Sequence, residues 1–167
     1  AQTDAAGRTT EYSPDVVTGL ITRITTPDGR ASAFYYNHHN QLTSATGPDG
    51  LELRREYDEW GRLIQETAPD GDITRYRYDN PHSDLPCATE DATGSRKTMT
   101  WSRYGQLLSF TDCSGYVTRY DHDRFWQMTA VHREEGLSQY RAYDSRGQLI
   151  AVKDTQGHET RYEYNIA

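Results

Sequence analysis

The sequence predicts an all-β fold: an antiparallel meander of repeated β-hairpins that forms a curved, spiralling sheet. Three observations support this prediction. A motif returns about every 21 residues, residues alternate along short runs with the period of a strand, and turn residues stand at fixed places. Residues 57–71, YDEWGRLIQETAPDG, show one unit, with a Tyr-Asp pair near its start and a Pro-Asp-Gly turn at its end.

The repeat is marked first by one large side chain per unit, which we call the anchor. The seven anchors follow one another at steps of 21, 21, 23, 21, 21 and 21 residues: Tyr36, Tyr57, Tyr78, Trp101, His122, Tyr143 and Tyr164. The turn glycines keep the same steps: Gly29, Gly50, Gly71, Gly94, Gly115, Gly136 and Gly157. Because two independent features share one irregular step, the repeat is real.

An apolar residue stands six residues after most anchors, as Leu63 follows Tyr57. After Tyr78 we assign this place to Leu85, and an eighth, weaker copy places Leu20 after Pro14. Around Tyr78 the run from Ile73 alternates with the period of a strand, and each Pro-Asp-Gly supplies a tight turn. Each unit is therefore expected to be two strands and two turns.

We predict a single array of about seven 21-residue hairpin units over residues 1–167, truncated at both ends. Strand twist of roughly 20° per step would curl so long a ribbon. Such an array is stabilised by neighbouring repeats. Its outer strands would leave N–H and C=O groups unpaired, so edge-to-edge self-association is expected.

Composition limits the function. Only 34% of residues are hydrophobic and the net charge is −7, which is typical of disorder, but thirteen tyrosines and the regular period argue against it. The acidic balance disfavours nucleic acid as a partner. No apolar run has the length of a membrane span, and residues 1–12 do not resemble a secretion signal. Cys87 and Cys113 are expected to be reduced thiols.

The Tyr-Asp-x-x-Gly-x-Leu core, clearest at residues 57–63 and 143–149, resembles the YD repeat of the Rhs family of bacterial polymorphic toxins. Related repeats occur in the BC component of Tc toxins and in teneurins. The resemblance covers residues 4–165 and implies a hollow β-shell that encloses a C-terminal toxin domain. It implies synthesis in the bacterial cytoplasm, delivery within a larger protein, commonly by type VI secretion, and a role in interbacterial competition. The expected partners are the rest of that shell and the toxin.

This chain departs from the family pattern in places. His122 replaces the anchor tyrosine, Trp126 replaces a turn glycine, and residues 80–84 replace a tight turn. No toxin domain, self-cleaving protease segment or delivery domain is recognisable within the sequence. We therefore expect these residues to form only a part of the shell wall.

No catalytic motif is present, and we expect neither an enzyme nor a cofactor. Asp121-His122-Asp123 looks like a metal-ligand set, but His122 fills an anchor place and its aspartates should face away from it, so no metal is expected. His82 and Cys87 lack the paired spacing of a zinc site.

Two features leave alternatives open. Arg54, Arg75, Arg119 and Arg161 are expected to form a ladder facing carboxylates on adjacent strands, rather than a track for phosphate or acidic glycan. Trp60 and Trp126 lie in turns, where aromatic rings stack on sugars, so a carbohydrate or cell-surface binding module is the alternative function.

Overall fold

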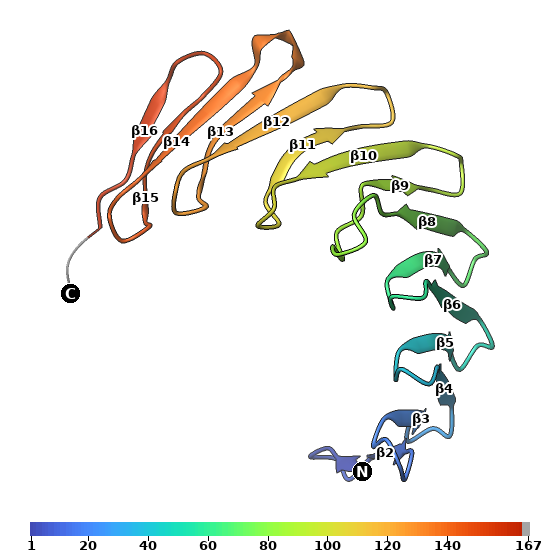
Figure 1. The fold of residues 1–167 in the computed structure, drawn as a ribbon. Coiled ribbons are helices and arrows are strands. Elements are labelled where there is room, and N and C mark those ends of the chain that lie inside the picture. The colour runs from blue at the N-terminus through green and yellow to red at the C-terminus, as the bar shows by residue number, and fades with distance from the viewer. Residues whose placement is uncertain (165–167) are drawn as a thin grey trace. The chain divides into compact units, whose positions relative to one another are not determined.

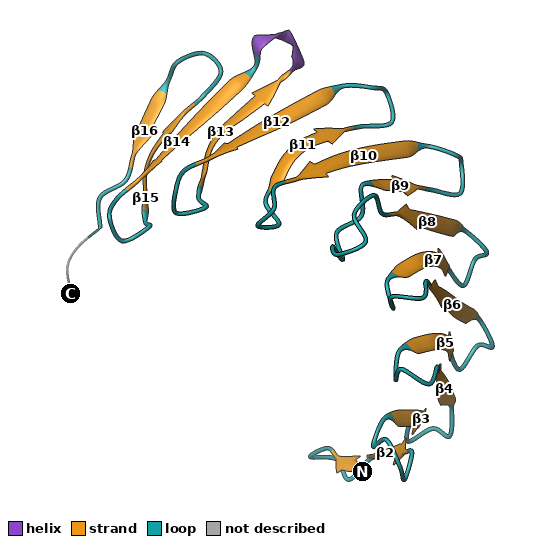
Figure 2. Cartoon of the chain, in the orientation of Figure 1, coloured by secondary structure: helices purple, strands orange, loops and turns teal. Residues whose placement is uncertain are grey.

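The computed structural model describes residues 1–164 and confirms the all-β antiparallel meander. Residues 165–167, the end of the predicted array, lie outside the described part. Sixteen strands and one short 3₁₀ helix, Glu134–Gly136, make up the regular structure of the described residues (Figure 2).

The chain divides into two compact units. The first holds residues 1–77 and 90–94, and the second holds residues 78–89 and the described residues from 95 onward. Within each unit the strands follow one another in chain order, each antiparallel to the one before (Figure 1).

The strands of the first unit are β1 (Gln2–Thr3), β2 (Thr9–Pro14), β3 (Ile21–Thr25), β4 (Ala31–Tyr36), β5 (Leu42–Thr46), β6 (Glu52–Tyr57), β7 (Leu63–Thr67) and β8 (Ile73–Arg77). The strands of the second are β10 (Arg96–Trp101), β11 (Leu107–Thr111), β12 (Val117–His122), β13 (Met128–Arg133), β14 (Ser138–Tyr143), β15 (Leu149–Lys153) and β16 (Glu159–Arg161). The residues of β9 (Ala88–Glu90) are divided between the units. Most strands have five or six residues.

The same turn geometry occurs at both ends of the strands. In the turn after β6, Gly61 N–H donates to the Asp58 carbonyl at 3.0 Å, and Asp58 N–H donates to the Arg62 carbonyl at 2.9 Å. The turn between β7 and β8 repeats this pattern with Ala68, Gly71 and Asp72. The last turn residue has positive φ in such a hairpin, which favours glycine. The seven predicted turn glycines have φ between +75° and +94°.

The same requirement explains two unusual residues. Asn40 and Trp126 occupy the place that Gly61 holds in its turn, and both have positive φ, at +61° and +68°. Asparagine tolerates this conformation better than most side chains, whereas tryptophan is strained in it. The replacement of glycine at Trp126 therefore leaves the shape of the turn unchanged and weakens it.

Gly71→Val should destabilise the β7–β8 hairpin by about 1–2 kcal/mol. The φ of Gly71 is +94°, and a Cβ added there meets no atom within 4 Å, so the cost comes from the backbone conformation rather than from a clash. Hydrogen exchange should accelerate in β7 and β8. Gly71→Asn is the control, expected to cost less because asparagine accepts positive φ. Equal effects of the two substitutions would contradict this explanation.

The sheet has almost no core. Among the described residues, only Ala88, Ala130 and Val131 are buried apolar residues, and no large side chain is fully buried. Stability therefore comes from half-buried side chains paired between neighbouring strands and from hydrogen bonds. A fold of this kind depends strongly on the bonds that connect one hairpin to the next.

Candidate functional site

The anchor side chains connect successive hairpins by one repeated hydrogen bond. Five of the seven anchors donate to the backbone carbonyl of the residue fifteen positions earlier, at 2.7 to 2.9 Å. The pairs are Tyr36 with Ile21, Tyr57 with Leu42, Trp101 with Pro86, Tyr143 with Met128, and Tyr164 with Leu149. The acceptor belongs to the preceding hairpin in every case. The anchors therefore link the repeats, which sequence reasoning did not foresee.

A β-bulge lies beside five of the anchors, and four of these five make this bond. Tyr57 lies opposite Leu63, whereas Glu56 lies opposite Gln65, so Ile64 is the additional residue. The same shift occurs beside Tyr36, Trp101, His122 and Tyr143. A bulge bends the strand and redirects the side chain next to it. The recurring bulge is therefore part of the repeat.

The residue after the anchor closes the turn. In eight turns the side-chain oxygen of the first residue accepts the N–H groups of the residues two and four positions later. Five of these first residues follow an anchor: Asn37, Asp58, Ser102, Asp123 and Asp144. The other three, Asp4, Asp112 and Asp154, begin turns that follow β1, β11 and β15, which do not end in an anchor. The two residues of the Tyr-Asp pair thus have different roles. The tyrosine links neighbouring hairpins, and the aspartate stabilises a turn. The recurrence of Asp, Asn or Ser at this place was the available sequence signal.

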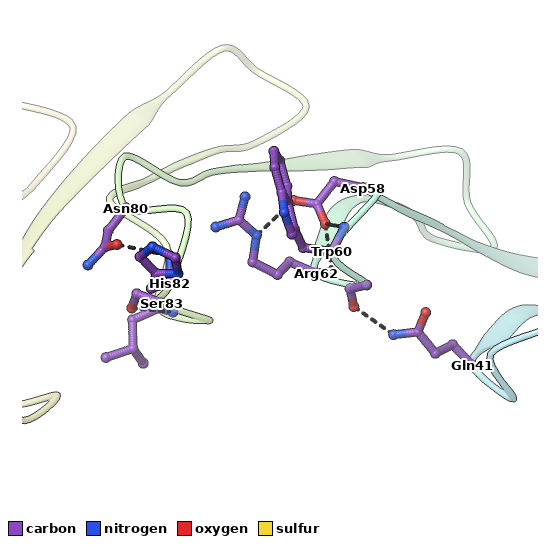
Figure 3. A network of polar contacts seen from close by, with 9 residues as sticks. Gln41, Asp58, Trp60, Arg62, Asn80, His82 and Ser83 are labelled. Atoms are coloured by element: carbon purple, nitrogen blue, oxygen red, sulfur yellow. Dashed lines mark hydrogen bonds and ion pairs between the residues drawn. The ribbon is translucent and has the colours of Figure 1, made fainter.

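Asp58 also holds the one buried charged side chain among the described residues. Its Oδ2 accepts from Arg62 Nε at 2.8 Å, and the two side chains are 15% and 8% exposed. The Arg62 guanidinium lies 5.1 Å from the Trp60 ring centroid. Figure 3 shows this cluster, with the Gln41 amide donating to the Gly61 carbonyl at 2.6 Å. The cluster therefore joins the turn after β4 to the turn after β6.

The unit around His122 lacks these bonds. His122 Nδ1 and Gln106 Nε2 are buried and have no hydrogen-bond partner. Gln106 stands in the place that Gln41 holds three hairpins earlier, where the amide does find a carbonyl. Leaving a buried polar atom unpaired costs about 1–3 kcal/mol. The departures from the repeat pattern at His122 and Trp126 thus coincide with a local loss of bonding.

Three sequence expectations need correction. Leu20 does not take the apolar place after Pro14: Ile21 lies opposite Pro14 and accepts from Tyr36, because that turn holds one additional residue. Leu85 does not take the place after Tyr78, since Pro86 accepts from Trp101 and the insertion displaces the repeat by two residues.

The arginine ladder across adjacent strands is also wrong in part. Arg54 and Arg161 pair with Glu52 and Glu159 on their own strands, at 2.7 and 2.8 Å. Arg75 does reach an adjacent strand, at 3.7 Å from Glu90. A carboxylate two residues away along a strand faces the same side, so no partner strand is needed.

Asp121 does not form a metal-ligand set with His122. Its carboxylate contacts another histidine, His132. Its Oδ2 lies 2.8 Å from His132 Nε2, and His132 Nδ1 lies 3.1 Å from Ser138 Oγ. These are the three residue types of a hydrolase triad, but the ring nitrogens are exchanged, since a triad serine bonds to Nε2 and its aspartate to Nδ1. The Asp121 side chain is also 63% exposed, so water competes for its oxygen atoms. No group of three or more metal-binding side chains occurs within residues 1–164.

The remaining predicted residues are placed as follows. Trp60 and Trp126 are 60% and 61% exposed in their turns, and Trp126 stacks on Tyr104 with ring centroids 5.2 Å apart. Cys87 and Cys113 are free thiols. In the described part of the chain, no helix is long and apolar enough to cross a membrane.

Acid should unfold the protein. The Thr26 hydroxyl and the Arg30 guanidinium lower the pKa of Asp28 from 3.8 to about 2, and the Arg54 side chain lowers the pKa of Glu52. Burial raises the pKa of Asp58, but the Arg62 N–H and guanidinium outweigh it and lower the pKa overall. Since these pKa values are lower in the folded state, the unfolded chain binds more protons between about pH 2 and 4. Stability is present above that window and lost within it.

Thermal unfolding followed by circular dichroism at a series of pH values measures this loss. We expect little change in Tm between pH 7 and 5 from these groups and a fall below about pH 4. Asp28→Asn should lower the Tm at pH 7 and lose most of that difference near pH 2, where about half of Asp28 is protonated in the folded state. A difference that persists at low pH would contradict the assignment.

Comparison with known proteins identifies the class that this geometry defines, a protein of linked hairpin repeats. The model of the RHS Repeat family matches residues 17–52, 57–82, 101–138 and 143–167, more than half of the chain. The chain belongs to this family.

A curated relative is the Double-stranded DNA deaminase toxin A of Burkholderia cenocepacia (strain H111). It is 45% identical over 62 residues, which are 37% of this chain and 4% of that protein. Among solved structures, TcdB2-TccC3 without its hypervariable C-terminal region has a TM-score of 0.72 at 16% identity, over 92% of this chain and 10% of that one. The Photorhabdus luminescens Tc holotoxin pore has a TM-score of 0.70 at 14% identity, over 91% and 9%. At these identities the structures show a common fold, and this chain spans a small part of each protein. Their names do not favour a carbohydrate-binding module.

Proposed function

We propose that this segment is a piece of wall in the toxin-enclosing shell of an Rhs-type polymorphic toxin, a protein used in competition between bacteria and delivered by a secretion machine such as type VI. The observation that carries the proposal is the anchor hydrogen bond, which repeats at a spacing of fifteen residues. It joins five of the hairpins to the one before, as a continuous wall requires.

The edge strands fit this proposal. Within the described residues, β1 and β16 each pair with one neighbour, β2 and β15. An edge of this kind pairs readily with a further strand. We infer that these edges continue into neighbouring hairpins of the same shell, and that edge-to-edge self-association occurs where those hairpins are missing.

Protease protection tests the proposal. In the full-length toxin that carries this segment, the toxin domain should resist a protease that cuts the isolated domain. Gln65→Pro in β7 removes a backbone donor from the sheet and should open the wall, so that the toxin domain is cut faster. Gln65→Ser is the control, with protection retained. A toxin domain cut equally fast in the parent, the variant and isolation would contradict enclosure.

We also infer that the segment is not an enzyme. Asp121, His132 and Ser138 are the residue types of a triad, but the two histidine nitrogens are exchanged and the Asp121 carboxylate is exposed. Both observations support a structural polar link across β12, β13 and β14. A fluorophosphonate probe should not label Ser138. Labelling that is lost in both His132→Ala and Asp121→Asn would show an activated serine and contradict this inference.

A further inference from the structure

Three successive turns of the second unit carry an unusual set of side chains. The turns after β10, β12 and β14 lie along one edge of that unit (Figure 1). Six residues in them define what we call the arginine–aromatic rim: Arg103, Tyr104, Arg124, Phe125, Trp126 and Arg146. Turns two strands apart are separated by only about 10 Å, so these side chains form one surface.

The aromatic members of the rim are strongly exposed. Tyr104, Phe125 and Trp126 are 53%, 66% and 61% exposed. Tyr104 and Trp126 stack on each other across neighbouring turns, with an interplanar angle of 23°. Clustered exposed aromatic side chains, unlike scattered ones, mark interaction surfaces.

The three rim arginines are without ion pairs among the described residues, whereas seven other arginines form them. Arg8, Arg30, Arg54, Arg55, Arg62, Arg75 and Arg161 each pair with a carboxylate. Arg103, Arg124 and Arg146 form no ion pair with any residue in the described range 1–164. Arg103 lies 4.6 Å from the centroid of the Tyr104 ring and donates to the Tyr104 hydroxyl, and Arg124 lies 4.7 Å from the centroid of the Phe125 ring. Stacking fixes the guanidinium and leaves donors free for an external acceptor.

The acidic residues of these turns do not neutralise the rim. Asp123 and Asp144 are half-buried, and their Oδ1 atoms accept backbone N–H groups of their own turns. The exposed charge at Arg103 and Arg124 is therefore positive, in a chain whose net charge is −7, whereas Arg146 lines one pocket together with the exposed Glu163. Such a surface complements carboxylates.

We propose that the arginine–aromatic rim docks a protein segment in which Asp or Glu residues alternate with apolar ones. Tyrosine, tryptophan and arginine dominate the binding energy of protein interfaces, and arginine matches a carboxylate with two parallel hydrogen bonds. Single-stranded nucleic acid fits less well. Tyr104 and Trp126 already stack on each other, and three arginines in an acidic chain make a short track for phosphates. This surface is independent of the proposed enclosure.

The test uses the full-length protein and a short fluorescein-labelled peptide of alternating glutamate and leucine or phenylalanine. Fluorescence anisotropy should show saturable binding, at least about tenfold tighter than for the same peptide with glutamine or lysine in place of glutamate. Arg103→Gln/Arg124→Gln should weaken binding at least about tenfold, and Phe125→Ser should also weaken it. Arg96→Gln is the matched control, since this exposed arginine lies at the far end of β10 and should not change binding.

Hydrogen exchange in β10 to β13 verifies that the variants remain folded. The proposal is overturned by equal affinity for the three peptides, by absence of binding, or by binding that the arginine and Phe125 variants leave unchanged. An oligothymidylate that binds the rim more tightly than the acidic peptide would also overturn it, and would assign the rim to nucleic acid. Self-association that the peptide does not displace would assign the rim to a second copy of the chain.

Discussion

Asp58→Ala should destabilise the β6–β7 hairpin by about 3 kcal/mol, the largest effect that we expect from any single substitution considered for this chain. The change removes the carboxylate opposite Arg62, whose side chain is 8% exposed, and leaves a buried charge without this partner. It also removes the acceptor for the N–H groups of Trp60 and Arg62. Backbone amides of β6 and β7 should exchange about two orders of magnitude faster.

Two control variants separate the causes. Asp58→Asn keeps an oxygen for the turn N–H groups and should cost less than Asp58→Ala. Adding Arg62→Met to Asp58→Ala removes the buried charge and should recover part of the loss. If Asp58→Ala costs less than about 1 kcal/mol, or the second substitution recovers nothing, the pair does not hold this hairpin.

His122→Tyr should stabilise the β12–β13 hairpin by about 1–2 kcal/mol. The substitution removes a buried Nδ1 atom that has no partner and supplies a hydroxyl. By analogy with Tyr57 and Leu42, that hydroxyl should donate to the Leu107 carbonyl, fifteen residues earlier. Thermal unfolding and hydrogen exchange in β11 to β13 measure the gain.

His122→Phe is the matched control, because it removes the same nitrogen without adding a donor. The tyrosine variant should exceed it in stability by about 1 kcal/mol, the net value of one hydrogen bond. A metal role for His122 predicts a different result: chelator would lower the Tm of the parent, and His122→Tyr would abolish that sensitivity. Either that outcome or a tyrosine variant less stable than the parent would contradict the anchor interpretation.

The meander of hairpins could be predicted because the repeat is local. The period of anchors and glycines, together with alternation from Ile73 to Tyr78, determines where strands and turns fall. The hydrogen bond from Tyr57 to Leu42 could not be predicted, because it depends on a bulge that shifts the register by one residue. Alternation within one strand contains no information about that shift.

Irregular turns limited the prediction elsewhere. Leu20 and Leu85 were assigned by counting from an anchor, and counting fails where a turn gains residues, so Ile21 and Pro86 hold those places instead. The arginine partners failed for another reason. A carboxylate on the same strand and one on the adjacent strand give surface ion pairs of similar energy, within about 1 kcal/mol, so sequence alone does not select between them.

The central claim is that this segment forms part of the wall of a closed shell. A cryo-electron microscopy reconstruction of the full-length protein that carries the segment tests this claim most directly. We expect β1 and β16 to pair with strands outside residues 1–167, in a closed shell that surrounds density for a separate domain. A reconstruction in which either strand keeps a free edge, or in which the sheet surrounds only solvent, would contradict the claim.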